Sequence, residues 1–201
     1  MPIKEDASMA VITVSRQYGT GGIHIGRGIA EKLGYRFMYL DELTAACRKH
    51  GLEINLEHIE GRPPKIVERL FGLNRDKVRN TIQEVMKEAA RAGDVVICGW
   101  GGQVLLKDHP GALHLRIVGS DESRTRHIMN SAGLPYAQAN EIVEKTSRDQ
   151  SLFSHFFFNV DFSDPKLYHT ALNIDQTSRE EIVETAAFML EEIRQETAAD
   201  G

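Results

Sequence analysis

The chain of 201 residues, with 41% hydrophobic and 26% charged residues, has the composition of a soluble globular protein. Its net charge of −5 gives no general reason to expect nucleic acid or an acidic membrane as a partner. The cysteines form neither a disulfide framework nor a metal pattern, and no apolar run reaches the ~18 residues that cross a membrane, so we expect a cytoplasmic protein. We expect one domain over residues 1–201, with no signal peptide and with flexible tails at 1–9 and 197–201.

A glycine-rich turn joins the first predicted strand to the first predicted helix. Residues 11–14 are mostly β-branched and suit a buried strand, and from Ile23 the apolar residues recur at helical spacing until Gly34. Glycines let a ligand approach the backbone of such a turn, and the free amides and dipole of the helix attract an anion. The turn therefore indicates a phosphate site, although a tight turn without a ligand stays an alternative.

This turn matches neither of the two common phosphate-binding motifs. In a P-loop, a lysine and a serine or threonine follow the last glycine, whereas Gly22 and Ile23 occupy those positions here. The dinucleotide fingerprint fails because His24 stands at its third glycine. The full positive charge that balances a phosphate bound at this turn must therefore come from other residues.

Strand and helix patterns alternate along the rest of the chain. The first predicted elements are a strand at 35–40, a helix capped by Asp41, a loop or lid at 49–64, and helices at 66–71 and from Asn74 to Gly93. They are followed by a strand at 95–98, a short helix at 104–106, a strand at 112–118 and a helix capped by Ser120. The last are one long helix or two joined pieces from Pro135 in its first turn to Phe157, a turn-rich segment at 159–168, a strand at 169–174 and a helix after a capping box at 178–181. Because five strands alternate with helices and no hairpin signal is present, we expect an α/β fold with a mainly parallel sheet covered on both faces.

Two positions that follow predicted strands are candidates for ligand contacts, because parallel sheets bind ligands beyond the carboxyl ends of their strands. Asp41 either only caps its helix or also contacts substrate or a hydrated metal ion. Trp100, in the glycine-rich turn after the strand at 95–98, either stacks on a base or packs in the interior. Cys98, inside that apolar strand, is expected to be a core residue.

Several blocks, in serial order, resemble the cytidylate kinase-like family. They are SRQYGTGG with the following IGR, VVICG with its glycine-rich turn, PGALHLRIV, and the segment from Arg148 to Asn173. The resemblance implies a three-layer P-loop NTPase-like fold with a five-stranded parallel sheet of order 2-3-1-4-5. It also implies transfer of a phosphoryl group from ATP, with Mg²⁺, to a nucleoside monophosphate or similar small acceptor. An acceptor-binding segment would span about 41–75, and a lid about 120–150.

The resemblance also implies roles for individual residues. Those assigned to phosphate or nucleotide binding are Ser15, Gln17, Tyr18, Gly19, Thr20, Gly21, Gly22, Ile23, His24 and Arg27. Those assigned to the acceptor are Asp41, Gly99, Trp100 and Asp161, and those assigned to catalysis are Arg16, Arg124 and Arg148. For Arg124 the alternative is a solvated helix face. No metal site made by the protein is expected, with Thr20 and Asp41 as weak candidates for a hydrated ion.

The functions that the sequence leaves open differ in whether other residues supply the charge of the missing lysine. Its loss removes a charge-assisted hydrogen bond worth on the order of 1.5 to 3 kcal/mol. Arg16, on the turn, and Arg27, one helical turn later, are candidates to replace it. With sufficient charge the protein is a phosphotransferase, and without it the protein is a degenerate module that binds nucleotide. A domain without a ligand is a third, weaker hypothesis, and a homo-oligomer is compatible with all three.

Overall fold

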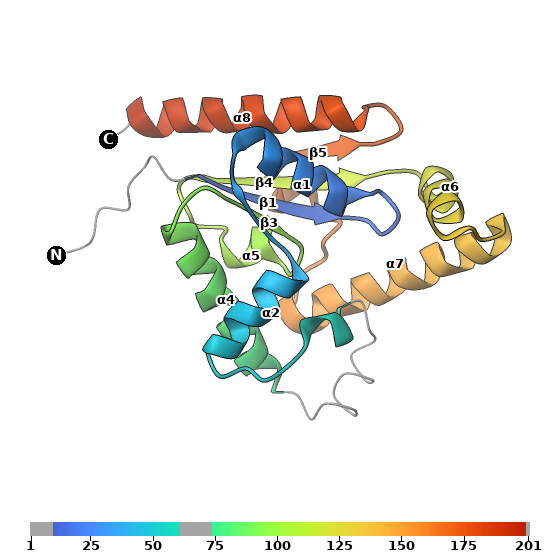
Figure 1. Cartoon of the computed structure of the whole chain (residues 1–201), viewed down its shortest axis with the longest axis horizontal. Coiled ribbons are helices and arrows are strands. Elements are labelled where there is room, and N and C mark those ends of the chain that lie inside the picture. The colour runs from blue at the N-terminus through green and yellow to red at the C-terminus, as the bar shows by residue number, and fades with distance from the viewer. Residues whose placement is uncertain (1–9, 61–73, 200–201) are drawn as a thin grey trace.

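The structure, a computed structural model, describes residues 10–60 and 74–199 (Figure 1). The predicted tail at 1–9 and the predicted helix at 66–71 lie outside the described residues. Among the helices that are described, none combines the length and the apolar character needed to cross a membrane.

A five-stranded parallel sheet forms the centre of the molecule. The strands are β1 (Val11–Arg16), β2 (Arg36–Met38), β3 (Val95–Cys98), β4 (Ala112–Val118) and β5 (Thr170–Asn173). Their order is β2-β3-β1-β4-β5, and every pairing is parallel, so the expected order 2-3-1-4-5 is confirmed. Because β1 is central, with Val11 beside Val95 on one side and Ala112 on the other, its carboxyl end lies in the middle of the sheet edge.

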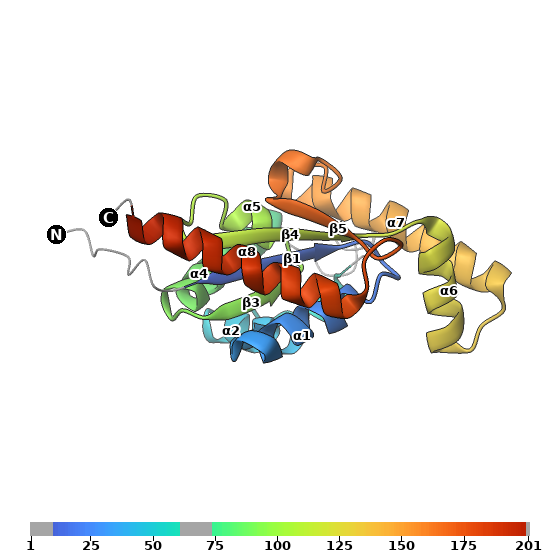
Figure 2. The same cartoon turned by 90° about the horizontal axis from the view of Figure 1, so that it is seen from above.

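Helices cover both faces of the sheet, as expected (Figures 1 and 2). One face carries α1 (Gly22–Leu33) and α8 (Arg179–Ala199), which pack on alternate β1 residues such as Ile12 and Val14. The other face carries α2 (Leu40–Lys49), α4 (Arg75–Arg91) and part of α7 (Tyr136–Phe158). The short elements are η1 (Leu56–His58), α5 (Gly102–Leu105), α6 (Asp121–Ala132) and η2 (Pro165–Leu167). Since α6 and α7 extend past the carboxyl ends of the strands, they overhang the edge where the glycine turn lies (Figure 2).

Several predicted helix ends differ from the observed ones, and the structure decides between the two alternatives for α7. The helix α2 begins at Leu40 with Tyr39 as its N-cap, because the Glu42 side chain accepts a hydrogen bond from the Tyr39 amide at 3.3 Å, so the prediction that Asp41 caps it is wrong. Pro135 precedes α7 as its N-cap and does not lie in its first turn. The helix α7 is one continuous element of 23 residues. The helix α8 runs to Ala199, so the prediction of a flexible tail is wrong for residues 197–199, and residues 200–201 lie outside the described residues.

A buried histidine in β4 makes stability depend on pH. His114 Nδ1 and the Thr13 hydroxyl form a hydrogen bond of 2.7 Å. Burial, together with nearby His169 and His109, lowers the pKa of His114 from 6.5 to about 4, and a hydrogen bond with the backbone of Leu106 opposes this shift only in part. Folded His114 is neutral at pH values where an unfolded chain would bind a proton, so its contribution is complete above pH 6.5 and is lost as pH falls toward 4. At 1.36 kcal/mol per pKa unit, this loss amounts to about 3 kcal/mol.

We therefore expect the free energy of unfolding in urea to fall more steeply between pH 7.5 and pH 5 for the natural chain than for His114→Asn. Asparagine places an amide near the Nδ1 position but does not titrate. All other titrating groups are common to the two proteins, so they cancel in the comparison. Equal slopes would contradict the neutral, buried state of His114.

Candidate functional site

Two cavities adjoin at the carboxyl edge of the sheet. The loop cavity, of about 280 Å³, is lined by Arg16, Gln17, Tyr18, Gly19, Gly21, Gly22, Ile23, His24, Tyr39, Glu60, His127, Ile128, Thr146 and Gln150. The edge cavity, of about 260 Å³, is lined by Ser15, Arg16, Gln17, Glu60, Gly99, Trp100, Gly101, Arg116, Ser147, Gln150, Ser151, Phe153, Ser154, Asp161, Phe162 and Ser163. Arg16, Gln17, Glu60 and Gln150 line both. Most of the residues predicted from the glycine turn are thus brought together around one site.

The glycine turn shapes the loop cavity through its backbone. Gly19 and Gly21 have positive φ values of 86° and 69°, and Gly21 is the N-cap of α1. No side chain caps this helix, and its first turn contains no acidic residue. The first amides of α1 therefore have no side-chain partner and carry the positive end of the helix dipole, which is the arrangement that binds phosphate.

Close packing explains why two of these positions are glycine. A Cβ at Gly19 would lie 2.9 Å from Cβ of Arg124, and a Cβ at Gly22 would lie 2.7 Å from Cβ of Arg16. Thr20 is buried, and its hydroxyl donates to the Gln17 carbonyl at 2.8 Å. The turn is therefore held against both the strand before it and the helix α6 above it.

Arg16, at the end of β1, lies between the two cavities. Its guanidinium donates to Glu60 and to the Tyr39 hydroxyl, both at 3.0 Å, and only 12% of its side chain is exposed. Burial alone would lower its pKa, but the charge of Glu60 and the nearby Cys98 and Tyr39 outweigh burial and raise it. Arg16 is thus a fixed cation at the point where the cavities meet, in agreement with its predicted place in the site.

Arg124, from α6, is buried and takes no part in lining either cavity. With 4% of its side chain exposed, it donates to the Tyr18 carbonyl and to the Ser147 hydroxyl at 3.0 Å, and it forms an ion pair with Asp121. The alternative of a solvated helix face is wrong. The geometry makes Arg124 a positioning residue that ties the glycine turn to α6 and α7.

Three other predicted residues do not reach the cavities. Arg148 is exposed over 67% of its side chain and lies 3.7 Å from Glu144 on the same helix, so its catalytic role stays a prediction. The guanidinium of Arg27 lies 4.6 Å from the centre of the Phe37 ring and lines neither cavity, so Arg27 does not replace the lysine. Asp41 is exposed in the first turn of α2 and lines neither cavity.

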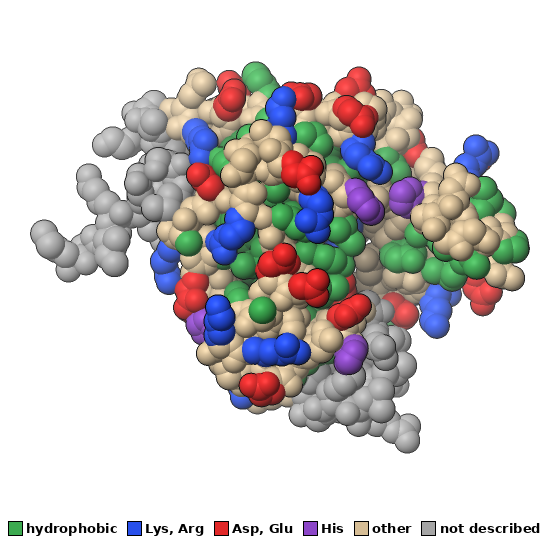
Figure 3. Space-filling view, in the orientation of Figure 1, with side chains coloured by type: hydrophobic (Ala, Val, Ile, Leu, Met, Phe, Trp, Pro, Cys, Tyr) green, Lys and Arg blue, Asp and Glu red, His purple; other side chains and the backbone are tan. Residues whose placement is uncertain are grey.

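Two nitrogen-bearing side chains from distant helices, His127 and Arg179, face the glycine turn, and sequence reasoning missed them. A Cβ at Gly21 would lie 3.4 Å from His127 of α6 and 3.5 Å from a guanidinium nitrogen of Arg179 of α8. Burial lowers the pKa of His127, and so do the neighbouring Arg179 and His24. Figure 3 shows histidine side chains gathered between the body of the molecule and α6. Among the residues that the structure describes, no carboxylate pairs with this cluster.

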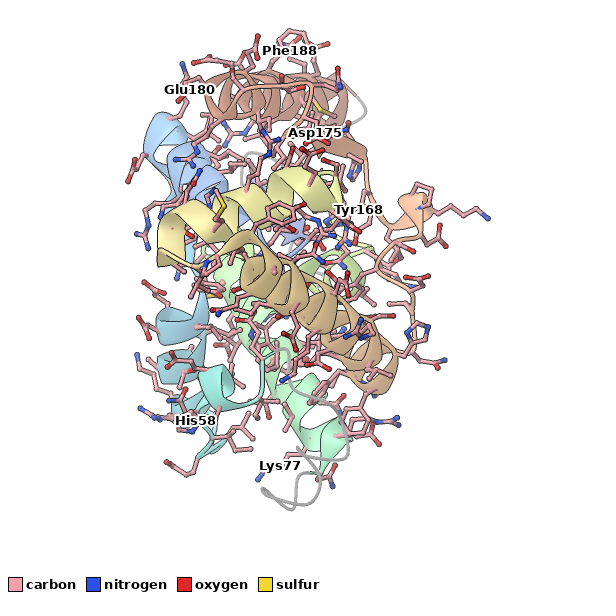
Figure 4. All side chains as sticks on the ribbon, turned by 90° about the vertical axis from the view of Figure 1, so that its right-hand side faces the viewer. His58, Lys77, Tyr168, Asp175, Glu180 and Phe188 are labelled. Carbon is pink, nitrogen blue, oxygen red and sulfur yellow. The ribbon has the colours of Figure 1, made fainter. Side chains whose placement is uncertain are left out.

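A second unpredicted cation, Arg116 of β4, lines the edge cavity. It donates to the Ser15 hydroxyl at 2.7 Å and lies 5.7 Å from the centre of the Tyr168 ring. The Tyr168 hydroxyl lies 3.2 Å from the same Ser15 oxygen and is fixed by the Phe162 carbonyl at 2.8 Å. Figure 4 shows Tyr168 on the side of the molecule that α6 and α7 overhang. An arginine inside an otherwise apolar strand was the signal that could have identified this position.

Trp100 packs in the interior. It is 2% exposed, and its ring meets those of Phe153 and Phe157 edge to face at 5.1 and 6.1 Å. Its φ of 53° places it in a left-handed turn between Gly99 and Gly101, which also have positive φ. The packing alternative for Trp100 is therefore correct. Gly99 and Asp161 line the edge cavity, and their role in binding an acceptor stays a prediction.

The donor set does not fit a magnesium ion held by the protein. No group of three metal-binding side chains occurs within the described part of the chain. The Thr20 hydroxyl is directed to a carbonyl, and Glu60, the described carboxylate of the loop cavity, is already bound by Arg16 and Tyr39. Mg²⁺ needs few protein ligands when phosphates and water complete its coordination. Such an ion would therefore be held mainly by the phosphates of a bound ligand.

Three solved structures share this fold at low sequence identity. An uncharacterized protein from Eubacterium ventriosum ATCC 27560 has a TM-score of 0.73 at 17% identity, covering 92% of this chain and 99% of that one. A shikimate kinase from Bacteroides thetaiotaomicron has a TM-score of 0.56 at 15% identity, covering 92% and 99%. A gluconokinase from Sinorhizobium meliloti 1021 has a TM-score of 0.56 at 17% identity, covering 96% and 97%. The fold is thus that of P-loop-like kinases.

Sequence comparison identifies the family. A comparison with curated proteins finds no match. The model of the cytidylate kinase-like family matches residues 11–176, which include the glycine turn, Arg116 and most of both cavities. Over most of its length, in sequence as in fold, the chain therefore belongs to the cytidylate kinase-like family.

Proposed function

We propose that the protein transfers a phosphoryl group from ATP to a small acceptor. The observation that carries the proposal is the pair of adjoining cavities that share Arg16, Gln17, Glu60 and Gln150. One cavity is walled by a glycine turn and a helix N-terminus, which suit the phosphates of a donor. The other has room for an acceptor at the same edge of the sheet.

In this proposal the protein acts mainly through position and charge. The transition state of phosphoryl transfer is loose, so fixed cations around the transferred group supply much of the catalysis. Arg16 stands where the cavities meet, and its partner Glu60 holds it there. Arg179, which faces the glycine turn, replaces the charge that the missing lysine would bring there.

Family and fold together support a small acceptor but do not point to a single one. The family name suggests a nucleoside monophosphate, whereas the structural neighbours include a shikimate kinase and a gluconokinase. Either choice is a compact molecule beside the donor phosphates. We therefore propose ATP with Mg²⁺ as the donor and a nucleoside monophosphate or a similar small molecule as the acceptor.

The experiment that tests this function measures ATP affinity and ADP release together. We expect Arg179→Gln to weaken ATP binding about 10-fold, because one charge-assisted hydrogen bond to phosphate is lost. The matched control is Lys32→Gln, which removes a charge from the same pair of helices, where Lys32 pairs with Glu184 away from the cavities. An equal effect of the two substitutions would refute the role of Arg179.

The same titration separates an enzyme from a binding module. ATP that raises the melting temperature but releases no ADP with any acceptor supports the degenerate module, a hypothesis favoured by the absent lysine. ADP release that depends on an acceptor supports the phosphotransferase. If ATP neither raises the melting temperature nor is turned over to ADP, both hypotheses are excluded.

A further inference from the structure

We infer that the acceptor is a small hydroxylated anion, such as a sugar acid or a sugar phosphate, and not a nucleoside monophosphate. The inference rests on the proposed function, because it takes the edge cavity as the acceptor site. Three features of that cavity carry it. They are the Arg116 guanidinium, which has no ion pair among the described residues, a wall rich in hydroxyl and amide groups, and aromatic lining residues that pack on other aromatic rings.

Arg116 supplies a positive charge that is not in direct contact with any described carboxylate. Its partners are the Ser15 hydroxyl and the Tyr168 ring, and no ion pair of Arg116 occurs in the described part of the chain, although Asp161 is near enough to raise its pKa. Burial is the larger effect and lowers that pKa. Arg16, by contrast, is compensated by Glu60. Since a partly buried cation without a counter-ion is costly, the cavity favours a ligand with one anionic group.

The rest of the polar wall suits hydroxyl groups. Ser151, Ser163, Gln150 and Asp161 line the edge cavity with donors and acceptors. Asp161 is held as a carboxylate, because hydrogen bonds from the backbone and side chain of Ser163 lower its pKa. A carboxylate in this position accepts hydrogen bonds from ligand hydroxyls and repels a second anionic group. The wall therefore selects a polyhydroxylated molecule with a single charged end.

The described aromatic residues of the edge cavity are engaged with one another more than with the cavity. The aromatic residues of the wall are Trp100 and Phe153, which are 2% and 6% exposed and pack edge to face on each other, and Phe162, which packs on Phe158. At about 260 Å³ the edge cavity has room for a small ligand.

Transfer of the γ-phosphoryl group of ATP to a hydroxyl of such an acceptor needs no further reagent. The acceptor hydroxyl oxygen forms a bond to the γ-phosphorus of ATP, and the bond from that phosphorus to the bridging oxygen breaks, with its electron pair leaving on ADP. The hydroxyl proton is released to water as the bond to phosphorus forms.

The test is a calorimetric titration of four probes into the protein saturated with a non-hydrolysable ATP analogue. The probes are gluconate, ribose 5-phosphate, sorbitol and cytidine monophosphate. We expect gluconate or ribose 5-phosphate to bind, and sorbitol and cytidine monophosphate to bind at least ~10-fold more weakly. Arg116→Gln should weaken the anionic probe about 10- to 100-fold, whereas Arg79→Gln, on the exposed side of α4 beside Asp76, should leave it unchanged.

Each outcome decides the inference. A preference for gluconate assigns the anion as a carboxylate, and a preference for ribose 5-phosphate assigns it as a phosphate. Tightest binding of cytidine monophosphate, equal binding of sorbitol, or an unchanged affinity in Arg116→Gln would overturn it. If Arg116→Gln fails to fold, Arg116→Lys keeps the charge and should lose less than ~10-fold. The probes are also titrated into the protein alone, so a failure of ATP to bind would count against the proposed function and not against the anion site.

Discussion

Gly99→Ala should lower the rate of phosphoryl transfer about 100-fold while leaving the protein folded. A Cβ at Gly99 would lie 2.5 Å from a terminal nitrogen of Arg16, so the guanidinium must move. The end of a long side chain yields easily, and the stability cost is then mainly that of the positive φ of 83°, about 1 to 2 kcal/mol. A misplacement of about 1 Å in a group that positions the reaction can cost about 10²-fold in rate.

The matched control is Gly51→Ala. Gly51 has a similar φ of 75°, but a Cβ there would have no neighbour within 4 Å. Both variants therefore carry the same backbone strain, and only one displaces Arg16. Urea unfolding and steady-state ADP release, measured on both, separate strain from displacement. A Gly99→Ala enzyme as active as Gly51→Ala would show that Arg16 needs no fixed position.

Arg124→Gln is expected to destabilise the fold by about 2 kcal/mol and to weaken ATP binding about 10-fold. The buried guanidinium holds the Tyr18 carbonyl and the Ser147 hydroxyl, and hydrogen bonds from a charged group contribute about 1.5 to 3 kcal/mol. Because Arg124 acts through the glycine turn, its loss should appear mainly in ATP affinity, with a smaller change in the rate at saturating ATP. The loss of rate without loss of affinity would instead indicate direct contact with the transferred group.

Arg148→Gln provides the comparison on the neighbouring helix. Arg148 is exposed, so this variant should unfold at the same urea concentration as the natural chain. If Arg148 nevertheless acts in catalysis, its variant will lose rate with stability intact. Full activity would leave Arg148 as a solvent-exposed residue of α7.

Local sequence patterns predicted the framework of the site because they are set by neighbouring residues. The β-branched run and the helical spacing after Ile23 placed the glycine turn between β1 and α1, and the alternation of elements gave a parallel sheet. The position of Arg16 followed from the same turn. What failed locally was the start of α2, where the backbone of Tyr39 and the side chain of Glu42 decide the cap that Asp41 had been expected to form.

The charges around the turn could not be predicted in the same way, because distant segments supply them. Arg179 and His127 meet Gly21 only after α8 and α6 have packed on the sheet. Periodicity also could not show that Arg124 is buried, since the polar face of a short helix looks the same whether it meets water or another helix. In each case the missing information was the tertiary contact.

The four residues common to both cavities place the two ligand sites side by side, separated by single side chains. One molecule that joins a nucleotide to an anionic polyol through a chain of phosphates could therefore occupy both spaces at once. Joining the two halves makes binding of the second intramolecular, so affinity can exceed that of either half by 10²- to 10⁴-fold or so. Such a molecule would be a selective inhibitor, because it would depend on Arg116 as well as on the glycine turn.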